Sequence, residues 1–306
     1  MLAITLAIVV STLVGAGAER RYEERARGAA RRLLDLVLWL LLPPVAFLAV
    51  VRLEVGGGVG AGLGLAYLEL AIVGTLAWLA GTRLLGLARP AVGALVVVVV
   101  LANTGYLGLP LSAALLGTDE LGTAVVFDQL VSGPMVYLAG FAVGAAFGTR
   151  AGEGWRARAR AFFLRNPVLP ALILGLVAPD ALAPDVAVEI AGYVVIGFLP
   201  VGFFVLGVNL ATEAREEGAR ALPAFSRPVA VALVLRMGVA PGLLLLASAA
   251  LVRLPDAYLL QAAMPSGINA LVVAHAYGLD LRVTAGAIAW TTLAAVAGGL
   301  LAAAVL

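Results

Sequence analysis

The chain has 306 residues, of which 63% are hydrophobic and 12% are charged, and its formal net charge is +2. A soluble domain is nearer about 45–50% apolar and about 25% charged, so this composition excludes an ordinary soluble protein and favours a polytopic membrane protein. The chain has no cysteine, which excludes disulfides, thiolate catalysis and thiolate metal sites.

Apolar runs of about 17–25 residues are long enough to cross the hydrocarbon core as helices. We expect ten such helices, and the sixth is the shortest and contains prolines. They lie at approximately 1–18, 33–51, 60–81, 91–117, 121–148, 166–180, 190–211, 229–252, 257–278 and 281–306. Arginines follow the first run instead of preceding it, which favours a transmembrane helix over a cleaved signal peptide.

Arginine placement predicts the orientation of these helices. All 20 basic residues are arginine, and 17 of them lie in the loops that follow the odd-numbered helices. Because positively charged loops stay in the cytoplasm, we expect both termini to be extracellular in a plasma-membrane protein. The arginine-rich segment 19–32 is expected to fix this topology and to contact anionic lipid headgroups, with Asp35 at the membrane interface.

Two apolar helices are interrupted in a similar way. The first interruption reads Leu101-Ala-Asn-Thr-Gly-Tyr-Leu-Gly-Leu-Pro110, and the second reads Ala263-Met-Pro-Ser-Gly-Ile-Asn-Ala270. The exits Gly117-Thr-Asp119 and Gly278-Leu-Asp280 follow at a constant offset of 161 residues. Two structural kinks are the simpler interpretation. However, paired interrupted helices in corresponding halves are typical of a transporter's substrate site.

The offset predicts an all-α protein made of two inverted five-helix repeats. Residues 1–148 would form the first repeat, 149–165 a cytoplasmic linker and 166–306 the second repeat. Because five is an odd number, the second repeat inserts upside down, and helices 4 and 9 become equivalent crossing helices. Their breaks are expected to meet near the midplane of the membrane, an architecture that permits alternating access.

Each break would expose helix N–H groups and a partial positive charge, which together suit a carboxylate or phosphate. Short polar side chains, glycines that permit close approach and prolines that interrupt the hydrogen-bond ladder surround both breaks. The candidate substrate-binding residues are Asn103, Thr104, Gly105, Gly108, Pro110, Pro265, Ser266, Gly267 and Asn269.

Four ionisable residues at membrane depth are candidates for ion coupling, because a charge buried in lipid is costly. Glu69 is the best candidate for a proton relay, although a neutral, hydrogen-bonded carboxyl is an equal alternative. Asp128 either binds an ion or forms a structural pair. Arg236 requires a counter-charge, with Glu69 or Asp128 as potential partners, and a structural pair is favoured over a substrate clamp. His275 is interpreted as a wall residue or as a group that titrates near neutral pH.

The chain resembles the auxin efflux carrier family, which includes plant PIN-type carriers and bacterial malate and malonate permeases. The motifs that carry the resemblance are 103–110 with Gly117, 166–170, 205–210 and 264–280. The resemblance implies a scaffold of helices 1, 2, 6 and 7 that often dimerises, and a mobile transport group of helices 3–5 and 8–10. It also implies carriage of small organic anions, with functional crossover residues at Asn103, Pro110, Pro265 and Asn269. The long cytoplasmic loop of the plant carriers is only about 17 residues here, so auxin is unsupported as a substrate.

The leading hypothesis is therefore a secondary carrier of a small carboxylate, and the alternative is a Na⁺-coupled symporter of the bile-acid-symporter type. An intramembrane enzyme is disfavoured because the chain has one histidine and no zinc-protease motif. A channel is disfavoured because the breaks differ from a charged-ring filter. We expect no cofactor or metal apart from H⁺ or Na⁺ coupling. The expected partners are the substrate anion, membrane lipids and a second copy of the chain, and no nucleic acid.

Overall fold

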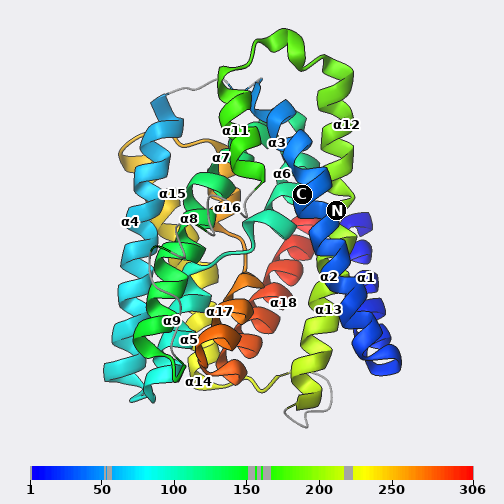
Figure 1. Cartoon of the computed structure of the whole chain (residues 1–306). Coiled ribbons are helices and arrows are strands. Elements are labelled where there is room, and N and C mark those ends of the chain that lie inside the picture. The colour runs from blue at the N-terminus through cyan, green and yellow to red at the C-terminus, as the bar shows by residue number, and fades with distance from the viewer. Residues whose placement is uncertain are drawn as a thin grey trace.

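The computed structural model describes residues 2–51, 53, 57–150, 156, 160, 167–216 and 223–305. Every regular element within these ranges is a helix (Figure 1). Among the described residues, five helices are long and apolar enough to cross a membrane, so the chain is a multi-pass membrane protein. These helices are Glu24–Val51, Gly58–Leu84, Asp185–Thr212, Arg227–Ala250 and Leu281–Gly298.

Contacts divide the helices into two groups. The first group consists of α1 (Leu2–Tyr22), α2 (Glu24–Leu36), η1 (Val37–Leu41), α3 (Leu42–Val51), α11 (Val168–Val177), η7 (Asp180–Leu182), α12 (Asp185–Ile196) and α13 (Phe198–Glu216). Helix α1 packs along α13, and α3 packs against α11 and α12. Small residues allow α1 and α13 to approach closely, because a Cβ at Gly207 would lie 2.1 Å from the Thr12 carbonyl oxygen.

The second group contains the two interrupted helices. From the first half of the chain it takes α4 (Gly57–Leu79), η2 (Ala80–Leu84), α5 (Arg89–Val100), η3 (Thr104–Gly108), α6 (Leu109–Leu115), η4 (Thr118–Glu120), α7 (Leu121–Phe127), η5 (Asp128–Ser132), α8 (Gly133–Met135), η6 (Val136–Gly140) and α9 (Phe141–Phe147). From the second half it takes α14 (Arg227–Val234), η8 (Leu235–Val239), α15 (Ala240–Ala250), α16 (Asp256–Ala262), α17 (Asn269–Tyr277) and α18 (Leu281–Val305).

The two groups meet along one interface. Helix α3 packs against α7, α12 packs against α6, and α13 contacts η3. Two close approaches at this interface need a residue without a side chain. A Cβ at Gly192 would lie 2.3 Å from the Thr118 Cγ2 atom, and a Cβ at Gly202 would lie 2.9 Å from the Tyr106 Cβ atom. The first interrupted helix therefore lies directly against the first group.

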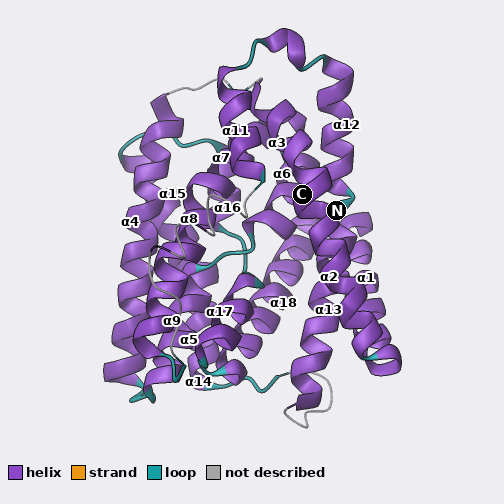
Figure 2. Cartoon of the chain, in the orientation of Figure 1, coloured by secondary structure: helices purple, strands orange, loops and turns teal. Residues whose placement is uncertain are grey.

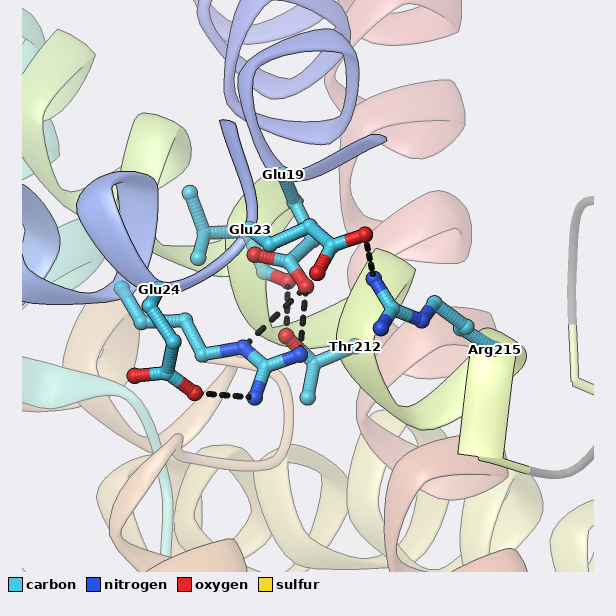
Figure 3. A network of polar contacts seen from close by, with 7 residues as sticks. Glu19, Glu23, Glu24, Thr212 and Arg215 are labelled. Atoms are coloured by element: carbon cyan, nitrogen blue, oxygen red, sulfur yellow. Dashed lines mark hydrogen bonds and ion pairs between the residues drawn. The ribbon is translucent and has the colours of Figure 1, made fainter. Parts of the chain in front are cut away.

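Polar contacts tie α1, α2 and α13 together at one end of the first group (Figure 3). Arg27 bonds the buried Glu19 at 2.7 Å and Glu24 at 3.0 Å, and Arg215 bonds Glu23 at 2.8 Å. Because Glu19 is almost wholly buried, its ion pair is shielded from solvent, whereas the Arg215–Glu23 pair is half exposed.

The structure differs from the expected helix bounds in two segments. The segment 19–32 is helical, so the second long helix begins at Glu24 instead of residue 33, and Asp35 lies inside it. Helix α11 has 10 residues and is too short to cross the hydrocarbon core alone. The linker 149–165 and Asn166 lie largely outside the described residues. The arrangement as ten transmembrane helices in inverted repeats stays a prediction.

Candidate functional site

The two interrupted helices cross at their breaks. Helix α5 ends at Val100 and α16 ends at Ala262, and the chain becomes helical again at Thr104 and Asn269. Ala102 and Ser266 form an antiparallel bridge between the two breaks. The Asn103 N–H donates to the Pro265 carbonyl at 2.8 Å, and the Gly267 N–H donates to the Leu101 carbonyl at 2.7 Å. Figure 2 shows these two loop segments in the middle of the helical bundle.

Local sequence explains why the backbones can meet here. A Cβ atom at Gly267 would lie 2.8 Å from the Ala102 carbonyl oxygen, so a larger residue would push the two segments apart. The exits of the two crossing segments are also alike, because Gly117 and Gly278 both have positive φ angles, of 94° and 67°. Such angles favour glycine, which has no Cβ to clash with its own backbone.

Arg236 supports the crossing from one side, which we call the rear. Its side chain is 1% exposed. The Nε and Nη1 atoms donate to the carbonyls of Met264 and Val99, each at 3.1 Å, and Nη2 donates to the Ala262 carbonyl. These carbonyls lie at the end of α5 and at and just beyond the end of α16, where backbone acceptors lack helical partners and carry partial negative charge.

The expected counter-charges of Arg236 are not in direct contact with it. Neither Glu69 nor Asp128 forms an ion pair with Arg236 within 4.0 Å, and all three residues belong to the described part of the chain. Arg236 still interacts electrostatically with Glu69 at longer range. Backbone carbonyls take the place of the expected carboxylate because two helix ends converge on the guanidinium.

Ser266 completes the rear of the crossing. Its hydroxyl donates to the Val98 carbonyl at 2.7 Å, and its own N–H donates to the Thr291 hydroxyl at 3.1 Å. Thr291 in turn donates to the Ala287 carbonyl in α18 at 2.7 Å. The rear of the crossing is thus joined by hydrogen bonds to the last helix.

A cavity of about 240 Å³ adjoins the crossing, and neither Arg236 nor any of its three acceptors belongs to its wall, so we call this side the front. Both breaks and both helix groups line it. Its wall consists of Val37, Leu38, Leu42, Leu101, Ala102, Asn103, Thr104, Gly105, Tyr106, Asp128, Gln129, Ser132, Gly133, Val136, Phe141, Phe198, Gly267, Ile268, Asn269 and Val272.

The polar groups of the front converge on the first residues of two helical segments. Thr104 Oγ1 donates to Asp128 Oδ1 at 2.5 Å, and Gln129 Nε2 donates to Asp128 Oδ2 at 2.7 Å. Asn103 is 7% exposed, and its side-chain amide has no hydrogen-bond partner among the described residues. Asn269 begins α17 on the other side of the cavity. The front therefore offers amide and N–H donors beside one carboxylate.

The structure places the predicted site residues in two different environments. Asn103, Thr104, Gly105, Gly267 and Asn269 line the cavity, as does Asp128. The other candidates lie outside its wall. Gly108 contacts the Gln261 amide, Pro110 is buried in α6, the Pro265 carbonyl and Ser266 take part in the crossing, and Arg236 supports its rear.

Two ion-coupling candidates lie away from the cavity. Glu69 is buried in α4, and its Oε1 atom has no hydrogen-bond partner within the described ranges. His275 is an exposed residue of α17, and its Nδ1 atom lies 3.0 Å from the Leu271 carbonyl oxygen. Asp128 is thus the one predicted coupling residue that the described structure places in the cavity wall.

Sequence reasoning missed several residues of the cavity wall. Tyr106 lies inside the first motif, and Gln129 follows Asp128. Both could have been predicted from the candidate residues beside them in the sequence. Val37, Phe141 and Phe198 could not have been predicted, because apolar residues of long transmembrane helices look alike until the helix groups are packed.

Comparison with known families gives one match. A family model described as "Membrane transport protein" matches residues 163–298, somewhat less than half of the chain. The match indicates a membrane transporter. The matched residues contain the second break and α17, which form one side of the cavity, and they support the family resemblance of the motifs. No curated protein matches the chain.

Proposed function

We propose that this protein is a secondary transporter of small organic anions, namely carboxylates, and that the substrate binds at the front of the crossing. The observation that carries the proposal is the cavity in which two interrupted helices restart at Thr104 and Asn269 beside the unpartnered amide of Asn103. Helix N-termini and amide N–H groups are donors suited to a carboxylate. A volume of about 240 Å³ fits a substrate smaller than a drug-sized ligand.

The position of the cavity supports alternating access. The cavity lies between the two helix groups, because Val37, Leu42 and Phe198 belong to the first group and the crossing belongs to the second. A second hollow of about 1190 Å³ lies between the same groups, near Leu53, Asp119 and Arg253. In the orientation that the arginines predict, the cavity faces the cytoplasm and the second hollow faces outside.

The helix groups supply the moving parts of this proposal. The first group, which is tied together by the Gly207 contact and the Arg27–Glu19 pair, serves as the scaffold and as the surface for a homodimer in the plasma membrane. The second group, which contains the crossing, moves relative to this scaffold during transport. An organic anion leaving an inside-negative cell gains about 2.3 kcal/mol per charge per 100 mV, so export needs no coupling ion, whereas uptake does.

The test is a counterflow screen in proteoliposomes. Purified protein is reconstituted with one unlabelled mono- or dicarboxylate inside, and entry of the labelled compound is followed. We expect saturable counterflow for at least one small carboxylate and none in protein-free liposomes. Flux that rises without saturation would indicate a channel, and no flux with any carboxylate would contradict the proposed function.

A second candidate is a Na⁺-coupled symporter, which buried oxygens beside the crossing favour. Ser112 Oγ in α6 and Gln261 Oε1 in α16 are fully buried and have no hydrogen-bond partner in the described structure. Helices α6 and α16 pack against each other. Uncharged oxygens of this kind are ligands for a hard cation. A counterflow or uptake signal that requires Na⁺ would favour this candidate.

A further inference from the structure

The front of the crossing contains an acid without a basic partner. Asp128 lines the cavity, and no arginine, lysine or histidine is among the described residues of its wall. The hydrogen bonds to the Asp128 carboxylate come from Thr104 and Gln129, which are both uncharged. Arg236 is turned to the rear, where its guanidinium donates to three backbone carbonyls.

The positive potential at the front comes from helix ends alone. The N-terminal ends of the helical segments that begin at Thr104 and Asn269 carry partial positive charge, which favours one ionised carboxylate nearby. A substrate carboxylate would add a second negative charge. Two carboxylates in one site disfavour double ionisation, and one of them takes up a proton.

We propose that Asp128 binds one proton together with each substrate carboxylate, so that the transporter is an anion–proton symporter. This inference rests on the proposed function and adds the coupling ion to it. In the loaded state the proton sits on one Asp128 carboxyl oxygen, and the helix N-termini and the Asn103 amide bind the ionised substrate. The proton and the anion bind from the same side of the membrane and are released together on the other side. One transport cycle with a monocarboxylate therefore moves no net charge across the membrane.

The contact with Thr104 suits both protonation states. When Asp128 is ionised, the Thr104 hydroxyl donates to Oδ1 across 2.5 Å. When Asp128 is protonated, the same hydroxyl can accept, because a hydroxyl is both donor and acceptor. Thr104 is the first residue of η3, so a change in the protonation state of Asp128 changes a hydrogen bond at the start of this helical segment.

In the described surroundings of Asp128, no basic side chain supplies a positive charge in place of this proton. Tyr106 in η3 and Asp35 in α2 are within electrostatic reach of each other, and Tyr106 is within reach of Asp128. From α4, which packs against η5, Tyr67 donates to the Leu130 carbonyl, and Glu69 interacts with Arg236. Apart from Arg236, which donates to backbone carbonyls, the titratable groups named here around Asp128 are acids or phenols.

The experiment measures proton uptake on binding. The full chain in detergent is titrated calorimetrically with acetate, malonate or succinate in Na⁺-free buffers of different ionisation enthalpy, which yields the number of protons taken up for each carboxylate bound. We expect about one proton in the wild type. Its affinity should fall about tenfold per pH unit on the alkaline side, as linkage to a single proton requires.

Two variants assign the proton. Asp128→Asn keeps the shape of the side chain and removes its charge, so it should take up no proton, and its affinity should not depend on pH. Glu69→Gln removes the other acid that is a coupling candidate and should still take up about one proton. Equal proton uptake by wild type and Asp128→Asn, or its loss in Glu69→Gln, would overturn the assignment to Asp128.

Measurements on the wild-type protein distinguish a failure of this inference from a failure of the proposed function. Carboxylate binding without proton uptake overturns this inference and leaves the proposed function standing. Absence of binding by all three carboxylates, together with absence of counterflow, overturns the proposed function and this inference with it. If Asp128→Asn does not fold, the wild type and Glu69→Gln provide the test. Uptake of about one proton by both proteins supports the inference, and its absence in either overturns it.

Discussion

The rear and the front of the crossing use the same two backbone segments in opposite ways. At the rear, Arg236 and Ser266 donate to the carbonyls at and beside the ends of α5 and α16. At the front, Asn103 and the first residues of the two restarted helical segments, Thr104 and Asn269, line a cavity. The carbonyl ends of the broken helices are therefore bound within the protein, and the N-terminal ends of the restarted helices lie at the cavity.

This difference separates stability from binding. In a lipid environment each backbone polar group that lacks a partner costs several kcal/mol, so an opened helix needs the rear contacts in order to exist. Groups at the front lower the stability of the empty protein and become useful when a ligand satisfies them. Substitutions at the rear should thus affect folding, and substitutions at the front should affect binding.

The largest expected effect is that of Arg236→Met, which removes the guanidinium behind the crossing. Three carbonyls lose their donor, and at about 1–3 kcal/mol for each unsatisfied buried group the stability should fall by at least about 3 kcal/mol. Thermal unfolding in detergent measures the loss. The control Arg83→Met changes an exposed arginine and should leave the melting temperature nearly unchanged. Equal melting temperatures for both variants would contradict the role of the rear.

The next effect is expected for Gly267→Ala, which tests how closely the two breaks must approach. Its Cβ would lie 2.8 Å from the Ala102 carbonyl oxygen, and such overpacking costs about 1–3 kcal/mol. Counterflow should be lost together with stability, because the variant forces the two breaks apart. Gly60→Ala is the control, since nothing lies within 4 Å of its Cβ, and it should be neutral or slightly stabilising. Normal flux in Gly267→Ala would show that the close contact is dispensable.

Asn103→Ala tests whether a residue at the front affects binding more than stability. The amide that it removes has no partner in the described structure, so the stability should change by less than about 1 kcal/mol. Carboxylate binding should weaken at least about tenfold, because one donor of the site is lost, which corresponds to about 1.4 kcal/mol. Calorimetric titration and thermal unfolding of the same preparation measure both. A destabilised variant with unchanged affinity would place Asn103 with the rear residues.

The smallest effect is expected far from the crossing. Arg215 and Glu23 form a half-exposed ion pair at the end of α13, with side chains 52% and 56% exposed. Pairs of this kind are worth about 0–1 kcal/mol, so Arg215→Ala should alter neither unfolding nor counterflow by much. A large loss of transport in this variant would show that motion of the scaffold end matters and would weaken the contrast between the two sides of the crossing.

The breaks were the most predictable part of the molecule. Asn103, Pro110 and Pro265 lie in apolar runs where a continuous helix would otherwise be expected, and the exits at Gly117 and Gly278 both adopt positive φ. Local chemistry was enough here, because proline lacks an N–H and glycine tolerates left-handed angles.

The partners of Arg236 could not be predicted, for a physical reason. Its three acceptors are backbone carbonyls of Val99, Ala262 and Met264, which every residue type carries, so no side-chain pattern indicates them. The helical state of segment 19–32 was missed because its arginines resemble those of a loop, whereas Arg27 is held by the buried Glu19. The cavity wall from α13 depends on the packing of the two groups.

The most direct measurement of substrate occupancy uses the absence of native cysteine. Ser132→Cys places a single thiol in the cavity wall, and Leu84→Cys places one at a site that is 75% exposed and outside the cavity. With a carboxylate that shows counterflow, modification of Ser132→Cys by a small thiosulfonate reagent should slow severalfold at saturating substrate, and modification of Leu84→Cys should not. Equal rates for Ser132→Cys with and without substrate would contradict binding at the front of the crossing.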